Sequence, residues 1–289
     1  MKLQRAFITV ICFAAFVIPA QLWGNEGATQ ARQRASANKD AELTKEDVMT
    51  ENVFGREVAA RIAGRYGLFE NAEATKYVNL VGSVLAQQTS RPELEFHFAV
   101  LNTDDIQSCA APGGYVFVTK GALRVMEDEA ELAGVLAHEI AHVANRDMIR
   151  DLNIRSSETP SGSGLALLIM APSLPVITAF EDLWDQNHAF EKALDILFVK
   201  GYKRPDDLVA DKAALFNAAL AGYDPEGLIR YLERVGTMKG KDTEILGRTH
   251  PAITERARRL EVTISTEGLE GGQSATFKER FEEMRKKAF

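Results

Sequence analysis

Two histidines four residues apart, with a glutamate directly after the first, constrain this chain more than any other feature. They stand in the segment His138-Glu139-Ile140-Ala141-His142. On an α-helix, residues i and i+4 lie one turn apart on the same face, so both imidazoles can bind one metal ion. Glu139 then lies within reach of a water molecule on that ion. The pattern predicts a zinc site that hydrolyses peptide bonds, in which Glu139 accepts a proton from the water and passes it to the leaving amine.

The flanking sequence predicts that this segment is helical. Acidic residues cluster at positions 127–131, where a helix start favours negative charge, and Arg146 and Arg150 follow, where a helix end favours positive charge. The apolar residues between them have helical spacing and are Leu132, Val135, Leu136, Ile140 and Val143. The alternative is an ordinary core helix whose two histidines bond to their neighbours.

The first 24 residues have the pattern of a secretory signal peptide. Lys2 and Arg5 form a short basic start, residues 6–20 form an apolar run, and Ala20 and Gly24 offer small residues for cleavage. We therefore expect a periplasmic or secreted protein, with an uncleaved membrane anchor as the alternative. Residues 25–50 contain few large apolar side chains and are expected to form a flexible linker.

Charge and cysteine content exclude two kinds of protein. The chain has 34 Lys and Arg against 41 Asp and Glu, and loss of Lys2 and Arg5 with the signal would change the formal net charge from −7 to −9. An acidic chain without a basic stripe excludes nucleic acid as an expected partner. Removal of the signal would leave Cys109 as the only cysteine, so no intramolecular disulfide is expected.

Patterns elsewhere predict an α+β fold that is mostly helical. Apolar residues at helical spacing between Val53 and Leu85, with a break near Gly67, predict two helices. Residues 94–100 alternate as a half-buried strand would, and Gly113-Gly114 leads into a second β-rich run at 115–119. The site helix follows directly. We expect one catalytic domain over residues 51–262, with a small β-sheet beside the histidine helix.

Two further segments leave alternatives open. Residues 164–180 are the most apolar stretch after the signal, but Pro172 and Pro175 interrupt them, so a membrane-spanning helix is not expected. They are expected to form either a loop packed on the core or a lid or membrane-contacting flap. Residues 263–289 are expected to form a C-terminal tail with a short amphipathic helix that docks on the body or on a partner.

A peptidase site of this kind needs three protein ligands and one open position. Asn145 and Met148 stand where the compact form of the motif would place a glycine and a third histidine, so the third ligand must come from elsewhere. The segment 202–211 offers carboxylates at the start of a predicted helix. Asp207 and Asp211 are i, i+4 on it, so one can bind metal while the other accepts a hydrogen bond from a ligand imidazole.

The chain resembles the BepA/HtpX-type zinc metallopeptidases, gluzincins related to the CAAX prenyl proteases. The resemblance extends from about Gly55 to Leu260. It is carried by residues 112–121, the zinc helix His138 to His142, Arg204 with Ala210-Asp211, residues 221–225, and Thr249-His250-Pro251. It implies a zincin-like metallopeptidase domain that binds one Zn2+ per chain and acts as an endopeptidase in the cell envelope.

The resemblance also implies roles for single residues. The family has a glutamate ligand three residues before its Ala-Asp pair, and Asp207 occupies that position here, with Asp206 or another carboxylate as the alternative. Asp211 would then hold a ligand imidazole, or else be a surface carboxylate. Because an aspartate is one methylene shorter than a glutamate, the helix that carries Asp207 must approach the zinc helix more closely.

The late loop of the family lies over the active site. His250 is therefore expected to bind the metal as a switch in a resting state, to donate a hydrogen bond in the transition state, or to lie in a surface turn. Arg256 is expected to stabilise the oxyanion or to form a salt bridge. Residues 108–111 resemble the sheet edge that receives a protein or peptide substrate as an added strand.

We therefore expect a zinc metalloendopeptidase that hydrolyses unfolded or misassembled envelope proteins, a role in protein quality control with envelope assembly proteins as candidate partners. The alternative is a low-turnover chaperone or assembly adaptor on the same fold, favoured by Asp207 and by a His250 that blocks the metal. An aminopeptidase ranks last, because no segment resembles an anchor for the α-amine of a substrate.

Overall fold

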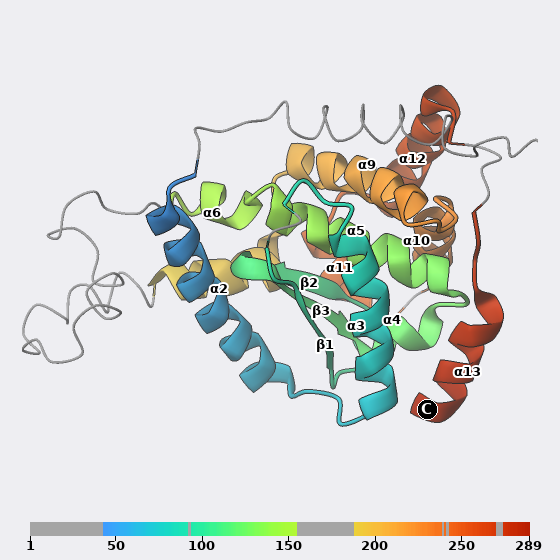
Figure 1. Cartoon of the computed structure of the whole chain (residues 1–289), viewed down its shortest axis with the longest axis horizontal. Coiled ribbons are helices and arrows are strands. Elements are labelled where there is room, and N and C mark those ends of the chain that lie inside the picture. The colour runs from blue at the N-terminus through green and yellow to red at the C-terminus, as the bar shows by residue number, and fades with distance from the viewer. Residues whose placement is uncertain (1–42, 92–93, 155–187, 239, 241–242, 270–273) are drawn as a thin grey trace, which may run out of the picture.

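The computed structural model describes residues 43–91, 94–154, 188–238, 240, 243–269 and 274–289 (Figure 1). The predicted signal peptide at 1–24, most of the predicted linker and the apolar segment 164–180 lie outside these residues. Among the helices within these ranges, none is both long enough and apolar enough to cross a membrane.

A pair of helices begins the described fold. α2 spans Lys45–Tyr66, α3 spans Ala72–Ala86, and Gly67, with a positive φ of 71°, ends the first of them. The break that the sequence predicted near Gly67 is therefore confirmed. α2 starts inside the predicted linker 25–50, because Thr44 and Asp47 form a capping box that satisfies the first backbone N–H groups of the helix.

A three-stranded mixed sheet follows. β1 (His97–Leu101) pairs in parallel with β3 (Tyr115–Thr119), and β2 (Ser108–Ala111) pairs antiparallel with β3, so the strand order is β1-β3-β2. The short helix η1 (Pro112–Gly114) joins β2 to β3. Gly114 has a φ of 94°, and a Cβ there would lie 2.1 Å from the carbonyl oxygen of Glu95, so this turn requires glycine.

The outer edge of β2 has no strand paired with it among the described residues. Within the described residues, the backbone of β2 bonds to β3 and to no other segment. The N–H of Thr119 donates to the carbonyl of Gln107, so these two residues form a hydrogen-bonded pair of the antiparallel ladder. Such pairs alternate with non-hydrogen-bonded pairs, so the neighbouring residues Ser108 and Val118 form a non-hydrogen-bonded pair. By this alternation, Ser108 and Ala110 direct their backbone N–H and C=O groups toward the outer edge.

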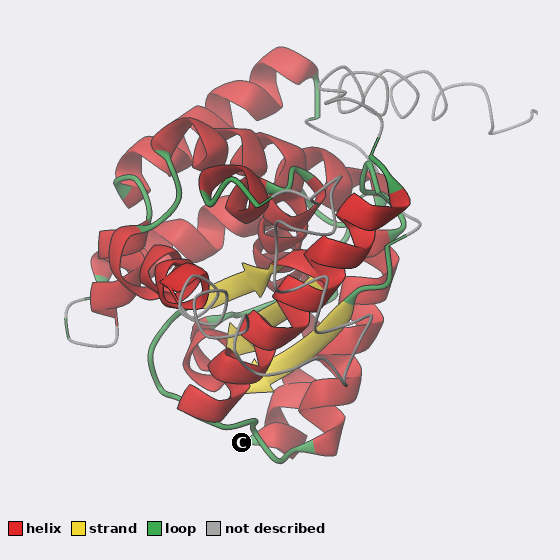
Figure 2. Ribbon diagram, turned by 90° about the vertical axis from the view of Figure 1, so that its left-hand side faces the viewer, coloured by secondary structure: helices red, strands yellow, loops and turns green. Residues whose placement is uncertain are grey.

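α5 (Glu129–Ala144) carries the histidine motif and runs through the middle of the molecule. Asp128 caps its start, and residues 129–143 are all buried. α4 (Lys120–Val125) leads into it from the sheet, while α3, α9 (Arg204–Leu220), α10 (Gly227–Thr237) and β2 pack against it (Figures 1 and 2). A helical domain with a small sheet beside the histidine helix confirms the predicted α+β fold.

The sheet separates two apolar cores. On one face, Ala110 and Val116 lie in the core that includes side chains of α3 and α5. On the other, Cys109 and Phe117 lie in the core that includes α2, α6 (Asp147–Asp151), residues 188–195 and η2 (Ile196–Lys200). Because successive side chains of a strand point to opposite faces, Ser108 and Ala110 face α5.

Three more helices come from the C-terminal part of the chain: α11 (Glu244–Thr249), α12 (Ile253–Glu267) and α13 (Lys278–Ala288). α12 packs against α9 and α10 and continues past residue 262, where the sequence analysis placed the domain end, because its apolar face extends to the buried Ile264. α13 packs against α3 and α5, with Phe281 fully buried. The predicted amphipathic helix thus lies on the body of the protein.

A buried carboxylate joins α13 to the histidine helix. Glu129, the first residue of α5, accepts hydrogen bonds from the hydroxyls of Tyr77 and Tyr223 and from two nitrogens of Arg280 on α13. The Glu129 side chain is only 1% exposed. Because a buried charge is stable only when it is paired and hydrogen-bonded, Arg280 stabilises the start of α5.

We expect Arg280→Ala to lower the free energy of unfolding by about 2 kcal/mol, because it leaves the Glu129 charge buried without its cationic partner. Lys287→Ala is the matched control, since it removes only an exposed pair with Glu283 on the same helix and should cost about 0.5 kcal/mol or less. Urea unfolding followed by circular dichroism measures both effects. Equal effects would contradict the role given to Arg280.

Candidate metal centre

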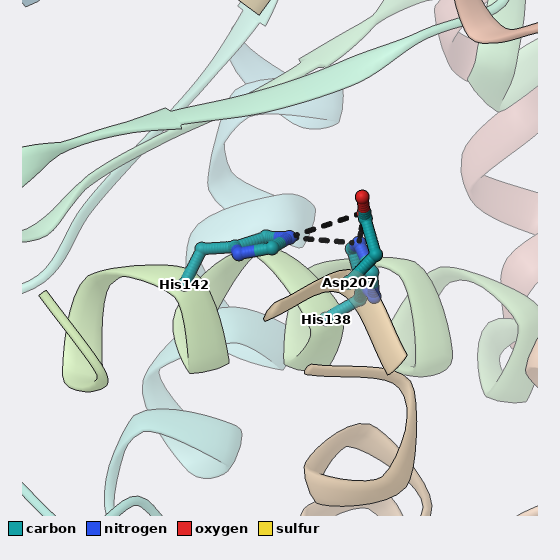
Figure 3. A group of neighbouring side chains, drawn as sticks. All are labelled: His138, His142 and Asp207. Atoms are coloured by element: carbon teal, nitrogen blue, oxygen red, sulfur yellow. Dashed lines mark hydrogen bonds and ion pairs between the residues drawn. The ribbon is translucent and has the colours of Figure 1, made fainter. Parts of the chain in front are cut away.

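Two imidazoles of α5 and one carboxylate of α9 point toward one another (Figure 3). The Nε2 atoms of His138 and His142 are 3.1 Å apart, and Oδ1 of Asp207 lies 3.8 and 3.7 Å from them, respectively. All three side chains are buried. Ligand atoms at about 2.0–2.2 Å from a tetrahedral zinc ion have comparable separations, so one small cation fits among these three groups.

The carboxylate of Asp207 supports this interpretation because it has no hydrogen-bond partner. Both of its oxygens are buried, and neither accepts a hydrogen bond from any group in the described part of the chain. A buried carboxylate in that state is strongly disfavoured. A metal ion would satisfy it, and two imidazoles with one carboxylate form a donor set that suits a catalytic metal.

The charge balance of the centre favours a cation as well. Glu139 and Asp207 are both buried, and neither forms an ion pair with a Lys or Arg side chain among the residues described. The histidines beside them carry charge only when protonated. A divalent cation at this position would balance both carboxylates.

Asp211 holds His138 from the side opposite the metal position. Its Oδ1 accepts a hydrogen bond from Nδ1 of His138 at 2.9 Å, which leaves Nε2 directed at the centre. Arg256 of α12, itself 2% exposed, binds Asp211 through Nε at 2.9 Å and Nη2 at 2.6 Å. Burial alone would raise the pKa of Asp211, but Arg256 and His138 lower it well below its usual value. Arg256 thus forms a salt bridge, and its contact with an oxyanion stays a prediction.

Asp147 holds His142 in the same way, and the sequence analysis did not identify it. Its Oδ2 accepts from Nδ1 of His142 at 2.7 Å, and its Oδ1 accepts from Nη2 of Arg150 at 2.6 Å. Arg150 also binds Asp206, next to the third candidate ligand, at 3.0 Å. The one sequence signal for this contact is that Asp147 is an acidic residue five positions after His142. Its side chain reaches back to His142 because Arg146, between them, adopts a left-handed conformation with φ 57°.

The pKa values of the cluster reflect its excess of negative charge. Burial disfavours a charged imidazole, yet the hydrogen bond to Asp147 and the nearby Asp207 and Glu139 raise the pKa of His142 to about 10. Burial also disfavours a charged carboxylate, yet the surrounding imidazoles lower the pKa of Asp207. The site therefore attracts positive charge. A bound metal cation would replace the proton, since an imidazole ligand must be neutral.

Glu139 lies beside the candidate ligands and contacts the edge strand. It is 2% exposed, and its Oε1 accepts a hydrogen bond from the hydroxyl of Ser108 at 2.7 Å. Tyr202, just before α9, stacks on His142 with 4.2 Å between the ring centroids. The sequence analysis related neither contact to the histidine motif, because the residues involved are brought together only by the packing of separate elements.

His250 lies at the end of α11, next to the same centre. Its Nε2 is 3.8 Å from Oδ1 of Asp207, and its side chain is 10% exposed, so it does not lie on an open surface turn. Burial and the nearby Arg256 lower the pKa of His250 to about 3, so the imidazole is neutral. Gly201 permits this approach, because a Cβ there would lie 1.7 Å from the carbonyl oxygen of Thr249.

Removal of the third candidate ligand should remove the metal. We expect Asp207→Ala to lose zinc on dialysis, whereas Asp206→Ala, adjacent in sequence but paired with Arg150, should keep about one zinc per chain. Metal analysis of the folded variants by mass spectrometry measures both. Zinc lost from Asp206→Ala and kept by Asp207→Ala would identify Asp206 as the ligand.

Comparison with known proteins covers the region that forms this centre. The profile of Peptidase family M48 matches residues 72–264. The Beta-barrel assembly-enhancing protease of Escherichia coli K12 is 25% identical over 203 residues, 68% of this chain and 40% of that protein. The Mitochondrial metalloendopeptidase OMA1 of Schizosaccharomyces pombe is 26% identical over 189 residues, 65% of this chain and 52% of that protein. The Protease HtpX homolog of Acidiphilium cryptum is 30% identical over 177 residues, 50% of this chain and 58% of that protein.

The matched region contains all the residues that meet at the centre, from the histidine motif to Asp207, His250 and Arg256. The chain spans about 40% of the length of the first of these relatives, so the match concerns the family and not everything that those longer proteins do. The profile nevertheless covers about two thirds of the 289 residues. As the resemblance to BepA/HtpX-type metallopeptidases predicted, the chain belongs to peptidase family M48.

Proposed function

We propose that this protein is a zinc metalloendopeptidase that hydrolyses unfolded or misassembled proteins of the cell envelope. The observation that carries the proposal is the buried, unpartnered carboxylate of Asp207 opposite the imidazoles of His138 and His142, with Glu139 beside them. Three such ligands leave one position of a tetrahedral zinc ion free, which is the arrangement of a catalytic site rather than a structural one.

Glu139 is positioned to transfer protons in the reaction. Zinc bound here would activate a water molecule and polarise the carbonyl of the scissile peptide bond. Glu139 takes a proton from the attacking water and delivers it to the peptide nitrogen, so that the C–N bond breaks and a free amine leaves. Asp211 and Asp147 keep the two ligand imidazoles oriented throughout, through hydrogen bonds at 2.9 and 2.7 Å.

The outer edge of β2, which has no strand paired with it among the described residues, supports binding of an extended substrate. Ser108 and Ala110 offer backbone N–H and C=O groups at this edge, to which a protein or peptide segment can add as an antiparallel strand. Such recognition uses the backbone of the substrate, so it depends little on sequence. It does require a segment whose own backbone is unpaired, which favours unfolded or misassembled proteins and cleavage within a chain.

The cell-envelope role rests on sequence and on the names of relatives. Residues 1–24 have the pattern of a cleaved signal peptide, with an uncleaved membrane anchor as the alternative. Relatives from Escherichia coli and Yersinia pestis are named Beta-barrel assembly-enhancing protease. We therefore propose a periplasmic or secreted protein with envelope assembly proteins as partners.

We expect Glu139→Gln to lower kcat for an unfolded substrate such as casein by about a thousandfold, because an amide cannot accept the proton of water. Its zinc content should match that of the wild type. Glu127→Gln, which replaces a carboxylate that is 58% exposed before α5, is the control and should cleave normally. Release of fluorescent casein fragments measures this, and full activity of the Glu139 variant would remove the mechanism.

A low-turnover chaperone or assembly adaptor on the same fold is the second candidate. It is favoured by His250, whose side chain is 10% exposed and forms, with His138 and Glu139, a second group of donor atoms close enough to share a metal ion. An imidazole at the fourth position would keep water from the metal. Catalysis would then require movement of the loop that contains His250.

The variant His250→Ala distinguishes the two candidates. If His250 blocks the metal of a peptidase, kcat/KM should rise by about tenfold or more, because a larger fraction of molecules is competent. A variant that stays inert but still binds unfolded casein supports the adaptor, and a fall in kcat with zinc retained supports hydrogen-bond donation in the transition state. His97→Ala, at a side chain that is 47% exposed on β1, is the control.

A further inference from the structure

The hydroxyl of Ser108 connects the substrate edge to the candidate base. Ser108 is the first residue of β2, its side chain faces α5, and its Oγ donates to Oε1 of Glu139 at 2.7 Å. Glu139 is 2% exposed. A hydrogen bond from a neutral hydroxyl to a buried carboxylate is stronger than one between neutral groups, because the acceptor is charged. This hydrogen bond is therefore strong enough to hold the Glu139 side chain in one conformation.

Ser108 is also the one side-chain donor to this carboxylate in the described part of the chain. No Lys, Arg, tyrosine or backbone N–H there donates to Glu139. With Oε1 occupied by Ser108, Oε2 is the oxygen left to accept a proton. Ser108, a residue outside the histidine motif, thus distinguishes the two oxygens of Glu139 by binding only Oε1.

The backbone of Ser108 lies where the substrate strand would add. Ser108 and Val118 form a non-hydrogen-bonded pair, so the N–H and C=O of Ser108 point to the outer edge of β2, away from β3. One residue therefore has its backbone at the substrate side and its hydroxyl on the base. This arrangement places the base at a set distance from any peptide bound to that edge.

We propose that Ser108 is a positioning residue that orients Glu139 for proton transfer, with Oε1 held and Oε2 directed at the reacting water. The inference rests on the proposed peptidase function. It assigns Ser108 no contact with the reacting atoms: the serine acts through Glu139. Loss of the hydroxyl should reduce the rate of the chemical step, while substrate binding through the β2 backbone should be unchanged, because the backbone groups remain in place.

The experiment uses the zinc-loaded full chain and three variants. Ser108→Ala removes the hydroxyl, Ser108→Thr keeps it on a side chain that suits a strand, and Ser83→Ala is a control at an exposed serine of α3. Steady-state cleavage of an internally quenched peptide gives kcat and KM. Zinc content and thermal unfolding show whether each variant is folded and loaded, and crystals of the wild type and of Ser108→Ala show the Glu139 side chain.

We expect Ser108→Ala to lower kcat by about tenfold with KM changed less than about twofold, at unchanged zinc content and melting temperature. Ser108→Thr should restore most of kcat. In crystals, Glu139 of Ser108→Ala should leave the conformation that it has in the wild type.

Three results would overturn the inference without touching the proposed function. The first is a wild-type kcat in Ser108→Ala, the second is a joint loss of kcat, zinc and stability, which would make the serine merely structural, and the third, in the crystals, is an unchanged Glu139. If the wild type itself cleaves no peptide, the proposed function fails, and the crystals still decide the inference. A Glu139 that keeps its conformation without the hydroxyl would show that Ser108 does not position it.

Discussion

Two buried carboxylates, Glu139 and Asp207, impose the constraint on which the centre of this structure depends, because neither forms an ion pair with a Lys or Arg side chain in the described part of the chain. An isolated buried charge is costly, and the interior offers no water to solvate it. The neighbouring acids Asp147 and Asp211, in contrast, each have an arginine partner. A divalent cation that replaced the proton of His142 would balance these charges, which agrees with membership of peptidase family M48.

The fold meets this constraint by packing α9 closely against α5. Ala210 and Ala214 of α9 are fully buried, and side chains this small let two helices approach. The short side chain of Asp207 therefore comes within 3.8 Å of both candidate histidine ligands. An arginine, Arg150, bonds both to the acid behind His142 and to Asp206, and so connects the segment after α5 with the start of α9.

Much of the local structure was predictable because its causes are local. Helical spacing located α5 and the pair α2 and α3, alternation located β1, and the paired glycines located β3. The start of α2 was missed because its capping box lies in a polar segment that composition alone describes as a linker. The fit between β2 and α5 was missed for a different reason: the bond from Ser108 to Glu139 joins residues 31 positions apart.

The sequence by itself determined that His138 and His142 share one helix face with Glu139 beside them, since the pitch of an α-helix leaves no other arrangement. It narrowed the third candidate ligand to a short acidic segment, in which the family resemblance favoured Asp207 over Asp206. Only the tertiary structure showed that Asp207 has no hydrogen-bond partner within the described residues whereas Asp206 is bound to an arginine. Only the tertiary structure placed Asp147 behind His142, a candidate ligand. Those distinctions depend on how α5, α9 and β2 pack, and no periodic pattern in the sequence reveals the packing between distant segments.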